Sequence, residues 1–64
     1  MNFTIPNMTC GGCAKSVTKV ILELDEKAIV ETDPANRKVQ IQTQAEENVL
    51  RTALKEAGYP VDPA

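Results

Sequence analysis

The chain has 64 residues, 42% of them hydrophobic, with one Phe, one Tyr and no Trp. A chain of this length builds one small aliphatic core and has no room for an elaborate catalytic pocket. Its net charge of −2 comes from interspersed acids and bases, whereas nucleic-acid binding requires a basic surface patch. We therefore expect a single domain over residues 1–64 that is neither an enzyme nor a nucleic-acid-binding protein.

The apolar runs are also too short for a membrane segment, since none approaches the ~20 residues that span a bilayer. The N-terminus lacks the basic and apolar regions of a signal peptide. We therefore expect no membrane insertion and a cytoplasmic location, where thiols are kept reduced.

Residues 2–6 form the first predicted strand, because Phe3 and Ile5 alternate with polar residues. Pro6 then ends the run. From residue 14 onward, apolar side chains recur at the i, i+3, i+4, i+7 spacing of one helical face. This spacing predicts an amphipathic helix whose buried face consists of Val17, Val20, Ile21 and Leu24.

Alternation with period two over residues 28–32 and 38–42 predicts two further strands, with Ile29 as an exposed exception. Between them, residues 33–36 read Asp-Pro-Ala-Asn, a run of turn-forming residue types. The two strands are therefore expected to form a hairpin.

A second helix is expected to begin at a capping box over residues 43–46, in which the Thr43 hydroxyl faces the amide of Glu46 and the Glu46 side chain reaches back. Gly58 supplies a left-handed stop at its end. Residues 60–62 predict a last edge strand. The apolar face of the second helix consists of Val49, Leu50, Ala53, Leu54 and Ala57.

The order strand, helix, strand, strand, helix, strand predicts an α+β, ferredoxin-like βαββαβ sandwich: a four-stranded antiparallel sheet with two helices on one face. In this topology the loop after the first strand, the hairpin turn at 33–37 and the corner at 58–59 meet at one end of the sheet. We therefore expect the two cysteines to lie beneath Tyr59.

Cys10 and Cys13, the only cysteines, lie in the run MTCGGC between the first strand and the first helix. Unpaired amides and the positive end of the helix dipole favour thiolates there, and Lys15 adds a nearby cation. Gly11 and Gly12 leave the sulfurs unobstructed and let the backbone bend, so that both can face one ion. This arrangement predicts chelation from one side, with a redox or structural disulfide as the rival interpretation.

Two thiolates form a soft ligand set, which favours Cu(I) and also accepts Hg(II). A structural Zn(II) site needs four ligands, and the chain has no histidine and no further cysteine. Two ligands in an exposed loop leave coordination positions open, so that a partner's thiolate can take over the ion by ligand exchange. This chemistry indicates metal transport rather than storage or catalysis.

The run MTCGGCA over residues 8–14, together with this order of elements, resembles the MxCxxC heavy-metal-associated domain family across essentially the whole chain. The resemblance implies that Cys10 and Cys13 are the metal ligands and that Met8 is buried and orients the loop from below. It also implies a small copper chaperone that delivers Cu(I) to the soluble metal-binding domain of a copper-transporting P-type ATPase.

Three positions refine this resemblance. Thr9 is neutral where zinc- and cadmium-binding members commonly carry a carboxylate, which disfavours zinc. Gly12 stands where a histidine is common, which implies copper that is more exposed or more easily shared between two chains. Tyr59 resembles the tyrosine of bacterial copper chaperones, and its hydroxyl is expected to shield a thiolate sulfur.

Lys15 and Lys19 lie four residues apart on the first helix and are expected to dock an acidic patch on the acceptor, with a solvated helix face as the alternative. The same two sulfurs could also take part in a copper-bridged homodimer, or share the ion with an extra ligand from glutathione or another thiol. Alternative functions are a regulatory domain of a heavy-metal ATPase, a mercury or zinc carrier, and a small dithiol oxidoreductase. The end of the chain at residues 62–64 favours a free-standing protein.

Overall fold

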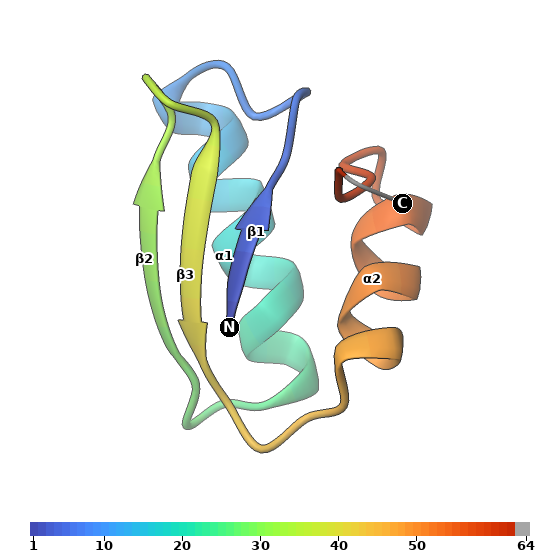
Figure 1. The fold of residues 1–64 in the computed structure, drawn as a ribbon. Coiled ribbons are helices and arrows are strands. Elements are labelled where there is room, and N and C mark those ends of the chain that lie inside the picture. Colours follow the sequence, from blue (N-terminus) through green and yellow to red (C-terminus); the bar gives the residue numbers. More distant parts are fainter. Residues whose placement is uncertain (63–64) are drawn as a thin grey trace.

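The computed structural model describes residues 1–62 and contains a three-stranded antiparallel sheet with two helices (Figure 1). The central strand β3 pairs with β1 on one side and with β2 on the other. In chain order, the elements are β1 (Asn2–Thr4), α1 (Gly11–Leu24), β2 (Ile29–Asp33), β3 (Lys38–Gln42) and α2 (Glu47–Glu56).

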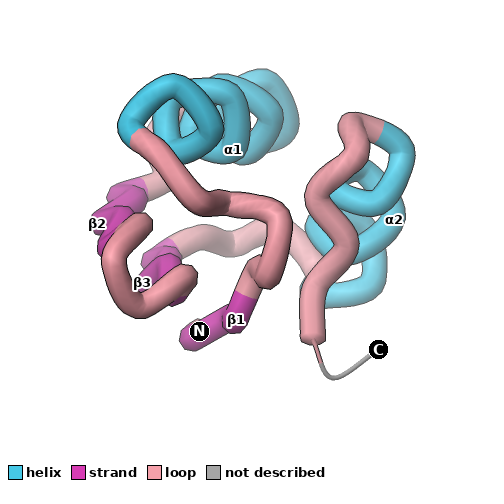
Figure 2. Tube along the Cα trace, turned by 90° about the horizontal axis from the view of Figure 1, so that it is seen from above, coloured by secondary structure: helices cyan, strands magenta, loops and turns pink. Residues whose placement is uncertain are grey.

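Both helices lie on the same side of the sheet. Figure 1 shows α1 crossing behind the strands, and the view along the sheet in Figure 2 places α2 beside α1, next to β1. This arrangement confirms the expected α+β, ferredoxin-like fold. The hairpin is also confirmed, because β2 and β3 pair through five residues on each strand across the turn.

The expected fourth strand at residues 60–62 is reduced to a single antiparallel bridge between Thr4 and Asp62. The Asp62 amide donates a hydrogen bond to the Thr4 carbonyl at 2.7 Å, and Val61 is buried in the core. Pro60 has no N–H to extend the ladder. Pro63 and Ala64, on which the expectation of a free-standing protein partly rested, lie outside the described residues.

The core lies between the sheet and the two helices; its members come from both helices, from β1, β3 and the segments after β1 and α2, while β2 adds only the partly buried Val30, which packs against it. Every side chain in it is less than a tenth exposed. Its members are Phe3, Ile5, Met8, Ala14, Val17, Ile21, Val39, Ile41, Leu50, Leu54 and Val61.

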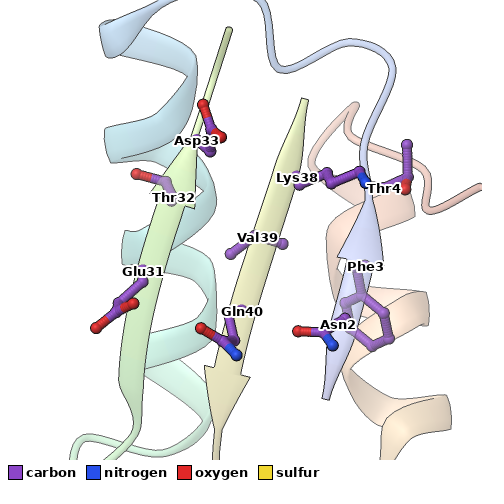
Figure 3. Close-up of a pocket in the computed structure, with 9 residues that line it drawn as sticks. All are labelled: Asn2, Phe3, Thr4, Glu31, Thr32, Asp33, Lys38, Val39 and Gln40. Atoms are coloured by element: carbon purple, nitrogen blue, oxygen red, sulfur yellow. The ribbon is translucent and has the colours of Figure 1, made fainter. Parts of the chain in front are cut away.

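The opposite face of the sheet is polar. Figure 3 shows Asn2, Gln40 and Glu31 side by side across the three strands, as the register of both strand pairs requires. Successive side chains of a strand point to opposite faces, so the next residues along β1 and β3, Phe3 and Val39, face the core. Asn2, Glu31 and Gln40 are exposed on this face, whereas the cysteines lie at the start of α1.

Three positions predicted on the apolar helix faces are exposed, so this part of the helix predictions is wrong. Leu24 is 40% exposed and Val49 is 45% exposed. Leu24 is the last residue of α1 and Val49 lies in the first turn of α2, where both line a surface depression at the edge of the helix pair. Ala57, just beyond α2, is exposed as well, whereas the prediction of an exposed Ile29 is confirmed at 56%.

The predicted capping box does not form, and α2 begins at Glu47 rather than within residues 43–46. The Thr43 hydroxyl donates to the Asp25 carboxylate at 2.7 Å and accepts from the Ala45 amide at 3.1 Å. The hydroxyl thus accepts the Ala45 amide in place of the Glu46 amide, so the capping interaction is not made. Glu46 occupies the N-cap position without a side-chain hydrogen bond.

Three connections meet at one end of the sheet, as expected, and all three face the viewer in Figure 2. The Ile5 amide donates to the Arg37 carbonyl at 2.8 Å, which ties the loop after β1 to the hairpin turn. The Asn7 side-chain amide donates to the Gly58 carbonyl at 3.1 Å, which ties the same loop to the corner after α2. The cysteine loop is therefore anchored on both sides.

Candidate metal-binding site

The two cysteine sulfurs lie together at the start of α1. Cys10 is the N-cap residue with an extended backbone, and Cys13 lies in the first helical turn. Because the residues are three apart across the helix start, both side chains point to the same side. The Cys10 thiol donates to the Cys13 sulfur at an Sγ–Sγ distance of 3.2 Å, and neither cysteine is in a disulfide.

Hydrogen bonds around Cys13 favour its thiolate. They lower the pKa of Cys13 from 9.0 to about 7, with the largest contribution from the Cys10 thiol, followed by the Thr9 backbone and the Tyr59 side chain. The unpaired amides and the dipole of the helix N-terminus act in the same direction. These contacts therefore favour a nucleophilic thiolate at Cys13 near neutral pH.

Gly11 and Gly12 are the first two residues of α1, and neither has a positive φ. A Cβ on Gly12 would lie 3.9 Å from the Cys10 sulfur, an ordinary van der Waals distance, and one on Gly11 would meet nothing within 4 Å. The expected glycine bend is therefore wrong. A normal helix start brings the sulfurs together, and the glycines mainly leave the space above them open.

Met8 lies beneath the cysteine loop, in the core of the protein. It is 0% exposed and packs in the core, and its amide closes the turn by donating to the Ile5 carbonyl at 3.0 Å. An unbranched thioether fills irregular space in a core well. This position agrees with the expectation that Met8 supports the loop from below.

Tyr59 lies against the cysteine pair, as the topology predicted. Its half-buried side chain lies close enough to Cys13 and Ser16 for both to affect the pKa of its hydroxyl. The nearby Cys13 raises the pKa of the Tyr59 hydroxyl, because a thiolate disfavours a second anion beside it. The hydroxyl therefore stays protonated at neutral pH, with a proton available to a nearby thiolate.

Sequence reasoning missed two residues of this site, Ser16 and Asn7. Ser16 lies one helical turn after Cys13, so the i, i+3 spacing was an available signal. Its hydroxyl also donates to the Gly12 carbonyl at 3.2 Å. Asn7 joins the loop to the corner beside Tyr59 through a contact between residues 51 positions apart, which no local pattern reveals.

Lys15 and Lys19 are exposed on α1 and line a groove between this helix and the hairpin turn. The groove begins at Gly11, directly beside the cysteines, and its floor includes Ala14 and Leu22. The two lysines therefore border the same surface as the sulfurs, on the side away from Tyr59's corner.

The candidate metal donors are the two sulfurs of Cys10 and Cys13. Over residues 1–62, no group of three or more His, Cys, Asp or Glu side chains is arranged to hold a metal. A closed four-ligand zinc site is therefore not provided by this part of the chain alone. Two soft ligands with open coordination positions suit a soft ion that is passed on.

Within the described residues, neither helix combines the length and the apolar character that crossing a bilayer would require.

Comparison with known proteins identifies the family and several similar structures. Residues 2–60 match the model of the heavy-metal-associated domain. The structure is similar to the crystal structure of a gold-binding protein, with 49% sequence identity and a TM-score of 0.93 over 95% of this chain and 94% of that one. A search of curated proteins gave no match.

Copper chaperones are also among the similar structures. A histidine-to-tyrosine variant of the copper chaperone Atx1 from Synechocystis PCC6803, in a trimeric form, has 39% identity and a TM-score of 0.92 over 97% of this chain and 98% of that one. The solution structure of the cyanobacterial copper metallochaperone ScAtx1 has 37% identity and a TM-score of 0.79 over 97% of each chain.

The family match covers nearly all of the described residues, and the similar structures bear metal-binding and metal-trafficking descriptions. These findings identify a metal-binding protein of the copper-chaperone type, not an enzyme. The chain belongs to the heavy-metal-associated domain family.

Proposed function

We propose that the protein is a Cu(I) metallochaperone in which Cys10 and Cys13 bind one ion. The observation that carries this proposal is the pair of sulfurs 3.2 Å apart at an exposed helix start, with hydrogen bonds that favour the thiolate of Cys13. Soft thiolates prefer Cu(I) over hard cations. The similar structures include copper chaperones and a gold-binding protein, all of which handle soft metals.

Release of the ion follows from the unequal exposure of the two ligands. Cys10 is exposed and Cys13 is half-buried against Tyr59, so an acceptor thiolate approaches the ion from the Cys10 side. A new copper–sulfur bond forms before an old one breaks, and the ion passes through a three-coordinate state without a change of oxidation state. Cys13 is the last donor ligand to leave, because Tyr59 and Ser16 hold its surroundings.

The proposed acceptor is the soluble metal-binding domain of a copper-transporting P-type ATPase. Lys15 and Lys19 border the groove that begins beside the cysteines, so an acidic surface docked there would bring its thiolates to the ion. Under this proposal residues 1–64 form one domain that acts in the cytoplasm. Thr9 and Gly12 place no further ligand at the ion, which leaves room for the acceptor.

Other thiol donors fit the same open site. Glutathione or another small thiol can occupy the third position, and a second copy of the chain can supply two more sulfurs to form a copper-bridged homodimer. One similar copper chaperone is described in a trimeric form. A mercury or zinc carrier and a regulatory ATPase domain remain the alternative functions, and metal competition together with the open reading frame decides among them.

The test is competitive titration of the reduced protein with Cu(I), Hg(II) and Zn(II) against chelators, with X-ray absorption of the copper-loaded product. We expect two sulfur ligands in near-linear geometry, and a loss of tight Cu(I) binding in both Cys10→Ser and Cys13→Ser. Circular dichroism should show that both variants keep the fold. Undiminished Cu(I) affinity in both variants, or zinc held more tightly than copper, would refute the proposal.

A further inference from the structure

The metal site is built from two segments that are far apart in the sequence. The loop before α1 carries the cysteines, and the corner after α2 carries Tyr59. Tyr59 contributes to the site only while this corner stays beside the loop. The contact between Asn7 and Gly58 joins the two segments directly.

On the loop side, Asn7 lies in a tight turn. The Met8 amide donates to the Ile5 carbonyl at 3.0 Å, so residues 5–8 form a β-turn with Pro6 and Asn7 at its centre. Pro6 pre-sets the backbone for this turn, and the fully buried Met8 anchors it to the core. The Asn7 side chain is therefore presented from a well-held backbone.

On the corner side, Gly58 is held by the end of α2. The Tyr59 amide donates to the Leu54 carbonyl at 2.8 Å and the Gly58 amide donates to the Lys55 carbonyl at 3.1 Å, which is a Schellman motif. Gly58 has a φ of +91°. Its amide is thus used within the helix end, and its carbonyl accepts the Asn7 side-chain amide at 3.1 Å.

We infer that Asn7 is a positioning residue of the metal site, which keeps the Tyr59 side chain against Cys13 by holding the Gly58 carbonyl beside the loop. The inference rests on the proposed function, because the Tyr59 contact matters for how long the ion is retained. Asn7 itself touches neither sulfur in a hydrogen bond. Its amide acts through the backbone of the residue that precedes Tyr59.

The experiment uses Asn7→Ala in the reduced full chain, with Asn48→Ala as a matched control, since Asn48 is exposed on α2. Tyr59 is the only tyrosine and there is no Trp, so intrinsic fluorescence reports this side chain alone. In the metal-free protein, Asn7→Ala is expected to raise the fluorescence intensity and lifetime, because Tyr59 moves away from the quenching sulfur. Asn48→Ala should leave both unchanged.

Copper release gives the functional readout. We expect Asn7→Ala to accelerate transfer of Cu(I) to a chelator roughly three- to tenfold, the range of one ordinary hydrogen bond. Tyr59→Phe should accelerate it similarly, and Asn7→Ala should add nothing in the Tyr59→Phe background. A merely structural role of Asn7 would instead accelerate release equally in both backgrounds, which would overturn the inference.

Unchanged fluorescence together with an unchanged release rate in Asn7→Ala would also overturn it. If Asn7→Ala fails to fold, Asn7→Ser takes its place, because the shorter side chain removes the amide donor while keeping a polar group. Failure of the wild-type protein to bind Cu(I) would refute the proposed function instead. In that case the fluorescence of the metal-free variants still decides whether Asn7 positions Tyr59.

Discussion

The Asp25 carboxylate accepts a hydrogen bond from the Thr43 hydroxyl, with 2.7 Å between the two oxygens, which links the end of α1 to the connection between β3 and α2. The same side chain accepts hydrogen bonds from the amides of Lys27 at 3.0 Å and Gln44 at 3.3 Å. One carboxylate thus organises two connections at the end of the molecule opposite the cysteines.

This relationship predicts a stability that depends on pH. The Thr43 hydroxyl and then the Lys27 amide lower the pKa of Asp25 below 3.8 in the folded protein. A lowered folded-state pKa adds stability that is fully present above the unfolded-state value and is lost as the pH falls through the folded-state value. Asp25→Asn should therefore lower the melting temperature near neutral pH, and the difference from wild type should shrink in strong acid.

Thermal unfolding followed by circular dichroism at a series of pH values checks this prediction. Glu26→Gln is the matched control, because Glu26 is the exposed neighbouring acid and should show no such pH-dependent difference. A gap between wild type and Asp25→Asn that stays constant from neutral pH to strong acid would contradict the argument.

The thiolate of Cys13 should respond to its donors in a definite order. The Cys10 thiol lowers its pKa most, and Tyr59 contributes less. Cys10→Ala is therefore expected to raise the pKa of Cys13 above about 7 by more than Tyr59→Phe does. The rate of alkylation of Cys13 as a function of pH measures its pKa. The double variant with Cys10→Ala and Tyr59→Phe tests whether the two shifts add. A larger rise of the pKa in Tyr59→Phe than in Cys10→Ala would contradict the prediction.

Gly58 should be sensitive to any side chain for a purely conformational reason. Its φ of +91° is unfavourable for other residues, although a Cβ there would meet nothing within 4 Å. Gly58→Ala is expected to destabilise the fold by about 1–2 kcal/mol. Gly11→Ala is the control, because Gly11 is helical with equally open space and ordinary φ, and denaturant unfolding should separate the two variants.

Two leucines of the helices differ in burial, and their replacement by alanine should differ in its effect on stability. Leu54 is 0% exposed in the core, whereas Leu24 is 40% exposed at the end of α1. Leu54→Ala is expected to cost about 2–5 kcal/mol of unfolding free energy, as is usual for a buried leucine. Leu24→Ala should lower the unfolding free energy by well under half as much in the same urea titration. Equal losses in the two variants would contradict the difference in burial between the two leucines.

The lysines beside the groove should control the rate of copper delivery. Lys15→Glu reverses a charge at the border of the groove that begins next to the cysteines. Transfer of Cu(I) to an acidic acceptor domain should slow, and added salt should narrow the difference from wild type, because screening weakens the attraction. Lys55→Glu on α2 is the control, and equal slowing by both variants would indicate an effect of net charge alone.

Much of this protein follows from local sequence patterns. The apolar spacing in residues 14–24 and the alternation in 38–42 produce the helix and the strand that the structure contains, because their periods match the geometry of those elements. The pair Cys10 and Cys13 carries its chemistry in its spacing, since three residues at a helix start bring two side chains to one side. The left-handed stop at Gly58 is equally local.

The tertiary structure decided the contacts between residues far apart in the chain. Thr43 donates its hydroxyl to Asp25, 18 residues away, and accepts the Ala45 amide instead of the Glu46 amide that the expected capping box requires. Asn7 meets Gly58 across 51 residues, and the last strand shrinks to one bridge at Asp62. Such partners depend on how the helices and the sheet pack together, so a pattern read along one segment indicates the candidate ligands but not the residues that hold them in place.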